Sequence, residues 1–148
     1  MDFDVDTAQI DAWAARLKGA DAVVRDELVG AMHRSVLTLE AKAKANAPVK
    51  TGTLRRSITG VVQPGGGAVR GVVGTNVPYA RYVHDGRGPV VAHGKALRFE
   101  IGGQVLFRKR VGPAKGKPFL RDAFAASTAA ILREFAQVIP RAARRLGF

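Results

Sequence analysis

The chain has 148 residues, a hydrophobic fraction of 47%, no cysteine and a formal net charge of +12. This length and apolar content suit one domain with one core, and the absence of cysteine excludes disulfides and thiol chemistry. The acidic start, MDFDVD, is unlike a secretory signal, and no apolar run approaches the ~18 residues of a membrane span, so we expect a soluble intracellular protein.

The charge is divided unevenly along the chain. Residues 1–40 contain eight acidic and four basic side chains, a net charge of −4, whereas residues 41–148 contain 20 basic and four acidic ones, a net charge of +16. This asymmetry favours either nucleic acid on the basic part or head-to-tail contact between oppositely charged surfaces of neighbouring subunits. The sequence leaves both interpretations open.

Two helices are predicted in the first third of the chain. Asp6 is a candidate N-cap for a short amphipathic helix that ends at Gly19. A second helix begins near Asp21 and must end before Pro48, because proline lacks a backbone N–H and disfavours helical backbone at the residue before it. At about 1.5 Å per residue, this helix is close to 40 Å long. Its expected buried stripe is Val24, Leu28, Met32, Val36, Leu39 and Ala43.

Strands are predicted in the middle of the chain. Residues 58–62 and 69–73 are rich in β-branched side chains and flank a glycine-rich tip. Residues 97–101 and 104–108 flank two glycines, which can adopt the positive φ angles of a two-residue hairpin turn. Residues 85–96 contain several glycines and are expected to form a flexible loop.

The last helix is expected to open at Pro118, because proline is tolerated at the first helical position. Its expected buried stripe is Leu120, Phe124, Ile131, Phe135 and Val138. Pro140 should end or kink it, which leaves residues 140–148 as a basic tail. The predicted fold is a single α+β domain over residues 1–148. In it, a small antiparallel sheet of about four strands packs against the long second helix and the C-terminal helix.

Two groups of exposed side chains are candidate contact residues. Arg55 and Arg56 are adjacent at the start of an expected extended segment, so they point in opposite directions and at least one faces solvent or a partner. Tyr79 and Tyr82 share a face of one helical turn, where they either cap the core edge or join Arg81 in an interface. Tyrosine and arginine anchor interfaces because they combine large area with directional hydrogen bonds.

The sequence predicts no enzymatic activity, cofactor or metal site. His84, Asp85 and His93 lie in or beside the glycine-rich loop without the spacing of a metal or catalytic set. The glycines of residues 65–67 lack the lysine and hydroxyl residue that complete a phosphate-binding loop, so a flexible hairpin tip is the simpler interpretation.

Three short segments occur in a fixed order. They are APVKTGTLRRSI at residues 47–58, PYARYVHDG at residues 78–86 and KPFLRDAF at residues 117–124. In this order they resemble a family of small neck and tail-component proteins of long-tailed double-stranded DNA phages, prophages and gene transfer agents, over about residues 25–140.

The resemblance implies a virion structural protein at the head-to-tail junction or the tail top, made in the host cytoplasm. It implies a homo-oligomeric ring between a head-closure or connector ring and a tail-completion or tail-tube ring, with DNA passing through. The number of subunits, six or twelve, the order of the neighbours and the kind of phage particle stay open. The alternative is a basic nucleic-acid-binding module without enzymatic activity, which would explain the charge, although no helix-turn-helix, zinc or RNA-binding signature supports it.

In such a ring the expected contacts between subunits or with a neighbouring ring are Arg55, Arg56, Tyr79, Arg81, Tyr82 and Arg87. The candidates for facing the lumen or DNA are Lys95, Arg108, Lys109 and Arg110. Clustered cations attract phosphates, but each such contact would retard DNA that must slide through a conduit. We therefore expect many of these charges to meet acidic surfaces of neighbours, including the N-terminal segment of the adjacent subunit, and transient DNA contact stays the alternative.

Overall fold

The computed structural model describes residues 14, 15, 17–65 and 68–148, so most of the predicted first helix lies outside the described residues. The helices with defined bounds are α2 (Ala20–Asn46), α3 (Thr53–Ser57), α4 (Ala80–Asp85), α5 (Phe119–Ala136) and α6 (Val138–Leu146). The strands are β1 (Thr59–Pro64), β2 (Val69–Gly74), β3 (Gly86–Arg87), β4 (Val90–Val91), β5 (Leu97–Ile101), β6 (Gln104–Arg108), β7 (Arg110–Val111) and β8 (Ala114–Lys115). The predicted α+β class, the long helix and the C-terminal helix are confirmed.

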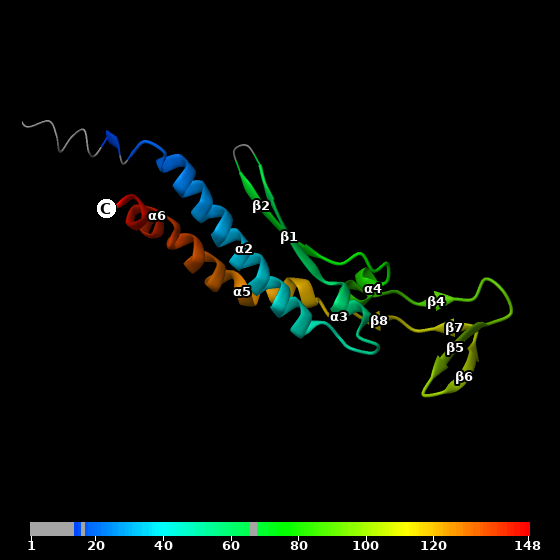
Figure 1. Ribbon diagram of the computed structural model, residues 1–148. Helices are drawn as coiled ribbons and strands as arrows, with labels where there is room; N and C mark the ends of the chain where they lie inside the picture. Colours follow the sequence, from blue (N-terminus) through cyan, green and yellow to red (C-terminus); the bar gives the residue numbers. More distant parts are fainter. Residues whose placement is uncertain (1–13, 16, 66–67) are drawn as a thin grey trace, which may run out of the picture.

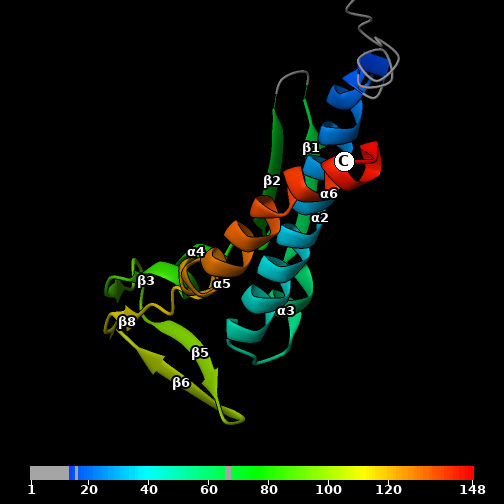
Figure 2. The ribbon, with the colours of Figure 1, turned by 90° about the vertical axis from the view of Figure 1, so that its left-hand side faces the viewer.

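The molecule is elongated. Helices α5 and α6 run alongside α2, and the hairpin β1–β2 packs against another side of α2 (Figures 1 and 2). We call these elements, together with α3 and α4, the body. Residues 86–118, which contain β3 to β8, extend away from the helices as narrow two-stranded ribbons, and we call them the arm.

Helix α2 begins after Gly19, which has a φ of 87°, and ends where Ala47 is extended in front of Pro48. The stripe predicted for it is confirmed, since all six side chains are half-buried or fully buried. A second set of small side chains is also buried: Ala31 and Ser35 on α2, and Ala123 and Ser127 on α5. Small side chains on both helices let α2 and α5 approach closely.

The stripe predicted for the last helix is confirmed except at one position. Leu120, Ile131 and Phe135 are half-buried, and Val138, which lies in α6, is buried. The prediction is wrong at Phe124. The fully buried side chains of α5 are Phe119, Ala123 and Ser127, whereas Phe124 is 57% exposed. The prediction followed the largest apolar residues. Ala123 and Ser127 are also buried, and their small size lets the backbones of α5 and α2 come close together.

The predicted basic tail is also wrong, because α6 is a helix. Helix α5 ends at Ala136 and α6 begins at Val138, so Pro140 is the third residue of α6. In the first turn of a helix the backbone N–H has no partner within the helix, so proline costs little there. Arg145 of α6 donates to Glu27 of α2 at 3.1 Å, which links these two helices.

The first hairpin is confirmed, and one of its faces lies on α2. Gly60 and Gly71 lie at this contact, where a β-carbon would collide with side chains of α2. The backbone N–H of Gly60 donates to Oε2 of Glu40 at 2.8 Å. The outer face of the hairpin carries the cross-strand pair Val61 and Val72, both about half exposed.

The second hairpin is confirmed with the predicted bounds, and Gly102 and Gly103 have φ angles of 59° and 81°. The expected single sheet is wrong, because the described strands form four separate two-stranded ladders. The predicted loop at residues 85–96 contains β3 and β4, which pair with β8 and β7. The chain leaves the body at α4 and returns at β8, so the second hairpin lies far out on the arm and cannot extend the first (Figure 1).

Candidate functional site

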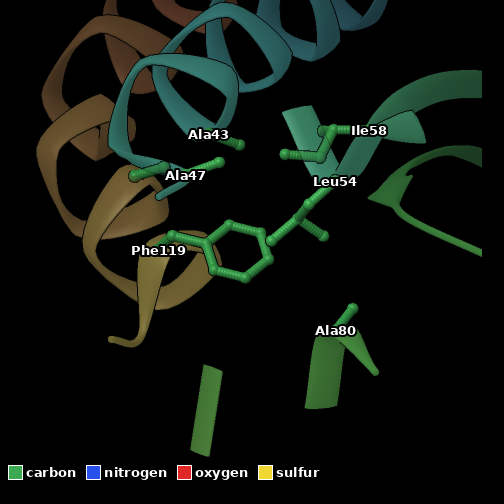
Figure 3. Close-up of a cluster of buried hydrophobic side chains, with 7 residues drawn as sticks. Ala43, Ala47, Leu54, Ile58, Ala80 and Phe119 are labelled. Atoms are coloured by element: carbon green, nitrogen blue, oxygen red, sulfur yellow. The ribbon is translucent and has the colours of Figure 1, made fainter. Parts of the chain in front are cut away.

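The three sequence segments converge on one buried cluster. Phe119 from the third segment packs with Leu54 and Ile58 from the first, with Ala80 from the second and with Ala43 of α2, all of them buried (Figure 3). These apolar members of the three segments therefore build a core, which accounts for their residue types. The charged and aromatic members that remain on the surface are the candidate contact residues.

Arg55 and Arg56 lie on the short helix α3 and not on an extended segment, so the expectation that they point in opposite directions along a strand is wrong. Gly52, with a φ of 78°, turns the chain so that Leu54 enters the core directly after the turn. The helical turn leaves both arginines exposed, and Arg56 makes a long hydrogen bond of 3.4 Å to the carbonyl of Thr51.

The predicted helical turn with Tyr79 and Tyr82 is confirmed as the start of α4. Their side chains are 44% and 51% exposed, and Cζ of Arg81 lies 5.1 Å from the centre of the Tyr82 ring. Tyr79 and Val83 line an open depression of about 430 Å³ together with residues 48–54 of the first segment. The first two segments thus present one continuous surface.

His84 connects α4 to the start of α5. Its Nδ1 lies 2.6 Å from Oδ1 of Asp85, its Nε2 accepts the backbone N–H of Arg121 at 3.4 Å, and its ring packs edge-on against Phe119 with centroids 5.4 Å apart. Both ring nitrogens are therefore engaged in structural contacts. Among the described residues, no group of three histidine or acidic side chains is arranged to hold a metal ion.

The arm carries the remaining candidates. Lys95, Arg108, Lys109 and Arg110 are exposed, and Arg87 is half-buried at the root, where it lies 3.4 Å from the carbonyl oxygen of Gly88. The arm contains eight basic side chains and one acidic one. In the part of the chain that the structure describes, none of these cations forms an ion pair.

Several acids of the body, in contrast, are paired within the molecule. Glu134 accepts from Arg34 at 2.7 Å and from Arg141 at 3.0 Å, and these hydrogen bonds hold the pKa of its carboxyl below the ordinary value. Glu27 is paired with Arg145. Among the described residues, several acids of the body are thus neutralised by ion pairs, whereas the cations of the arm are not.

The sequence-based predictions missed exposed apolar side chains. Among the large apolar side chains of the arm, Ile101 and Phe107 are the most exposed, at 61% and 63%. On the helices, Leu132 and Ile139 are each 64% exposed. The signal for the arm was present in the sequence, since a hairpin separated from the core cannot bury both of its faces.

The three segments thus meet in a buried junction with exposed tyrosines and arginines around it, and the arm beside it exposes cations that form no ion pair among the described residues. The family model described as "Bacteriophage HK97-gp10, putative tail-component" matches residues 11–86, slightly more than half of the chain. The chain therefore belongs to the HK97-gp10-like family of bacteriophage tail components, and the resemblance seen in the sequence is confirmed for this part. No match was found among curated proteins or among solved structures.

Membership of this family supports a structural role in a phage tail and a location in the virion. None of the described helices is long and apolar enough to span a membrane. The matched residues end at the root of the arm, so the family model covers α2, the first hairpin and α4 but not the arm.

Proposed function

We infer that identical copies of this protein form a ring at the head-to-tail junction or the top of the tail, which joins the head connector to the tail and lets DNA pass. The observation that carries this inference is the division of the three segments: Leu54, Ile58, Ala80 and Phe119 are buried in one cluster, while Tyr79, Arg81 and Tyr82 are exposed beside it. Exposed tyrosine and arginine on a rigid core are typical of interface anchors.

In this ring, the residues that contact the next subunit or a neighbouring ring are Arg55, Arg56, Tyr79, Arg81, Tyr82 and Arg87. The neighbours are a head-closure or connector ring on one side and tail-completion or tail-tube proteins on the other. A heterologous contact that closes on rotation generates such a ring from one kind of subunit. The role is non-enzymatic and requires no cofactor.

The test is electron microscopy of the purified protein and of particles that contain it. A ring located at the neck or tail top supports the proposal, and a protein that stays monomeric and is absent from particles would overturn it. Tyr82→Ala should weaken assembly by about 1–3 kcal/mol, the cost typical of an interface anchor, and leave the unfolding transition unchanged. Leu37→Ala is the matched control, since Leu37 is 64% exposed on α2 and lies outside the three segments.

The alternative function, a basic nucleic-acid-binding module, is favoured by the unpaired cations of the arm. Lys95, Arg108, Lys109 and Arg110 would then face DNA, in the lumen of the ring or without any ring. Binding of DNA by the monomer that falls steeply with salt would support this alternative. We favour acidic protein surfaces as the partners of these cations, because a conduit that binds DNA tightly would impede its passage.

A further inference from the structure

Helix α5 is apolar on two opposite sides. Its inner side, which includes the buried Ala123 and Ser127, packs against α2 (Figures 1 and 2). A row of exposed apolar residues follows its opposite side and continues onto α6, and we call this row the outer face: Ala125, Ala129, Leu132, Ala136 and Ile139. Leu132 and Ile139 are each 64% exposed, so no described element occupies this side. A surface helix normally turns polar residues to solvent, and apolar residues on two opposite sides are typical of a helix with two packing partners.

The outer face has the spacing of a contact between two helices. Its members are separated alternately by four and three positions, which lets side chains interlock with a second helix as knobs into holes. Gln137, between α5 and α6, keeps helical backbone angles, and α6 continues α5 in nearly the same direction (Figures 1 and 2). The two charged residues of this stretch leave the row apolar. Glu134 is paired on the inner side, and Arg133 lies at the margin of the row, where it donates to the carbonyl of Ala129 at 3.2 Å.

The outer face is complementary to a second copy of itself. Its knob positions form two sets: one consists of the small Ala129 and Ala136, and the other contains the large Leu132 and Ile139. Because antiparallel helices place one set against the other, Leu132 can lie opposite Ala136 of the second copy, and Ile139 then lies opposite Ala129. Parallel helices would place alanine against alanine and leave gaps. We propose that two copies of this protein pair through their outer faces as antiparallel helices in this register.

The charges at the two ends of the contact match in this register. Because the helices of the two copies run in opposite directions, Asp122 in the first turn of α5 lies within about one helical turn of Arg144 in the last turn of the second copy's α6. The Asp122 side chain is 59% exposed, and its ion pair with Arg121 is long, at 3.8 Å. Arg144 is exposed. The two-fold symmetry repeats the contact at the other end, so charge complementarity supports a second copy as the partner.

The size of the contact is that of a weak complex. Residues 122–146 extend over about 36 Å and a helix is about 10 Å wide, so the contact covers roughly 360 Å² on each copy. Stable complexes bury about 800 Å² on each partner, and smaller contacts are typical of transient ones. We therefore expect the two copies to pair at micromolar concentrations. We call this complex the pair and keep the word assembly for the ring and the particle.

Sedimentation of the full chain at about 1–100 µM tests the pair. Leu132→Asp should raise its dissociation constant at least about tenfold, because a carboxylate would be buried without a partner in the middle of the contact. Leu37→Asp is the matched control, since Leu37 is also 64% exposed but lies on α2, and it should pair like the wild type. Circular dichroism and thermal unfolding show whether the two variants fold alike.

Three results would overturn the proposal. One is a Leu132→Asp protein that pairs like the wild type, and another is an equal loss of pairing in both variants. The third is a wild-type protein that contains no pair at the highest concentration, which would mean that another part of the same chain, or nothing, covers the outer face.

Arg133 gives an independent measurement of the register. In the antiparallel pair, the Arg133 side chains of the two copies lie on the same edge, close to the two-fold axis. An equimolar mixture of wild-type and Arg133→Glu proteins should therefore contain about two- to fivefold more mixed pairs than random mixing gives, because only the mixed pair sets arginine against glutamate. Native mass spectrometry with a size tag on one protein measures the three kinds of pair. Lys42→Glu, which changes an exposed charge of α2, is the control and should mix at random. Random mixing of Arg133→Glu would overturn the proposed register.

The pair and the ring are independent of each other. A two-fold contact closes with two copies, so it cannot build a ring by itself, and it uses none of the contact residues proposed for the ring. A wild-type protein that forms the pair and is never found in a ring or particle would refute the ring and support the pair. Rings formed by Leu132→Asp with the same mass and symmetry as those of the wild type would refute the pair and leave the ring intact.

Discussion

The contact between the first hairpin and α2 depends on two glycines. A β-carbon at Gly60 would lie 2.3 Å from Cγ1 of Val36, and one at Gly71 would lie 2.6 Å from Sδ of Met32 and from Cγ2 of Val36. Neither glycine has a positive φ, so alanine is compatible with the backbone at both positions. The cost of Gly60→Ala or Gly71→Ala therefore arises from packing alone.

The size of this cost follows from the geometry. Ordinary contact begins near 3.4 Å, so the hairpin must move away from α2 by almost an ångström. Such overpacking costs about 1–3 kcal/mol, and the reduced flexibility of the unfolded chain returns about 0.4–1 kcal/mol. We expect a net loss of about 1–2 kcal/mol in the free energy of unfolding, which lowers Tm by about 3–8 °C. Equilibrium denaturation and thermal unfolding measure it.

Gly74→Ala is the matched control, because Gly74 lies in β2, lacks a positive φ, and would have no atom within 4 Å of its β-carbon. It should leave stability unchanged or raise it slightly. In a Val36→Ala background, the additional cost of Gly60→Ala should shrink, since the colliding methyl groups are gone. Gly60→Ala and Gly71→Ala proteins as stable as Gly74→Ala would refute this account of the contact.

Two further predictions concern buried or partly buried polar groups. The hydrogen bond from Lys44 and the one from the backbone N–H of Gly60 hold the pKa of Glu40 below its ordinary value of 4.5. The stability that Glu40 contributes is therefore present above about pH 4.5 and is lost as pH falls through the lowered pKa of the folded state. Glu40→Gln should lower the free energy of unfolding by about 1 kcal/mol at pH 7. The variant should then lose less stability than the wild type as the pH is lowered in a series of denaturation measurements. Ser35 and Ser127 each bury a hydroxyl oxygen that has no hydrogen-bond partner among the described residues. Replacing either with alanine should leave stability unchanged or raise it by about 1 kcal/mol in urea denaturation, and a loss of that size would contradict the assignment.

The elements that were predicted correctly are those specified by local chemistry. Gly102 and Gly103 both adopt positive φ, as a two-residue turn requires, and the alternation on either side fixes the strand bounds. Helix α2 ends in front of Pro48 for an equally local reason. Such features depend on neighbours in the sequence, so they can be predicted without knowledge of the tertiary structure.

The incorrect predictions concern features that are determined by contacts between segments distant in the sequence. The buried face of α5 is set by the close approach of α2, which selects Ala123 and Ser127 over the larger Phe124. Pro140 was expected near the end of one long helix. Because α5 ends at Ala136, Pro140 lies instead in the first turn of α6, where proline is tolerated. The candidate residues were chosen for their types. All of them except the half-buried Arg87 are exposed, and their roles and partners stay predictions.

The two strands at the root of the arm lie side by side, from which we predict that the body folds without the arm. The N–H of Lys117 donates to the carbonyl of Val83 at 2.8 Å, and Arg87 pairs directly with Ala114, so the chain returns to the place where it left. Replacing residues 88–113 with Asn-Gly, a two-residue hairpin turn, should therefore close β3 onto β8 without strain.

The body of this shortened protein should keep its helix content and unfold within a few degrees of the wild type, because the deleted residues include no fully buried side chain. Assembly should be lost, since the arm's cations and apolar side chains are removed together. Circular dichroism and sedimentation measure the two properties separately. An unfolded variant would show that the arm supports the core, and a variant that still assembles would show that the body alone holds the subunits together.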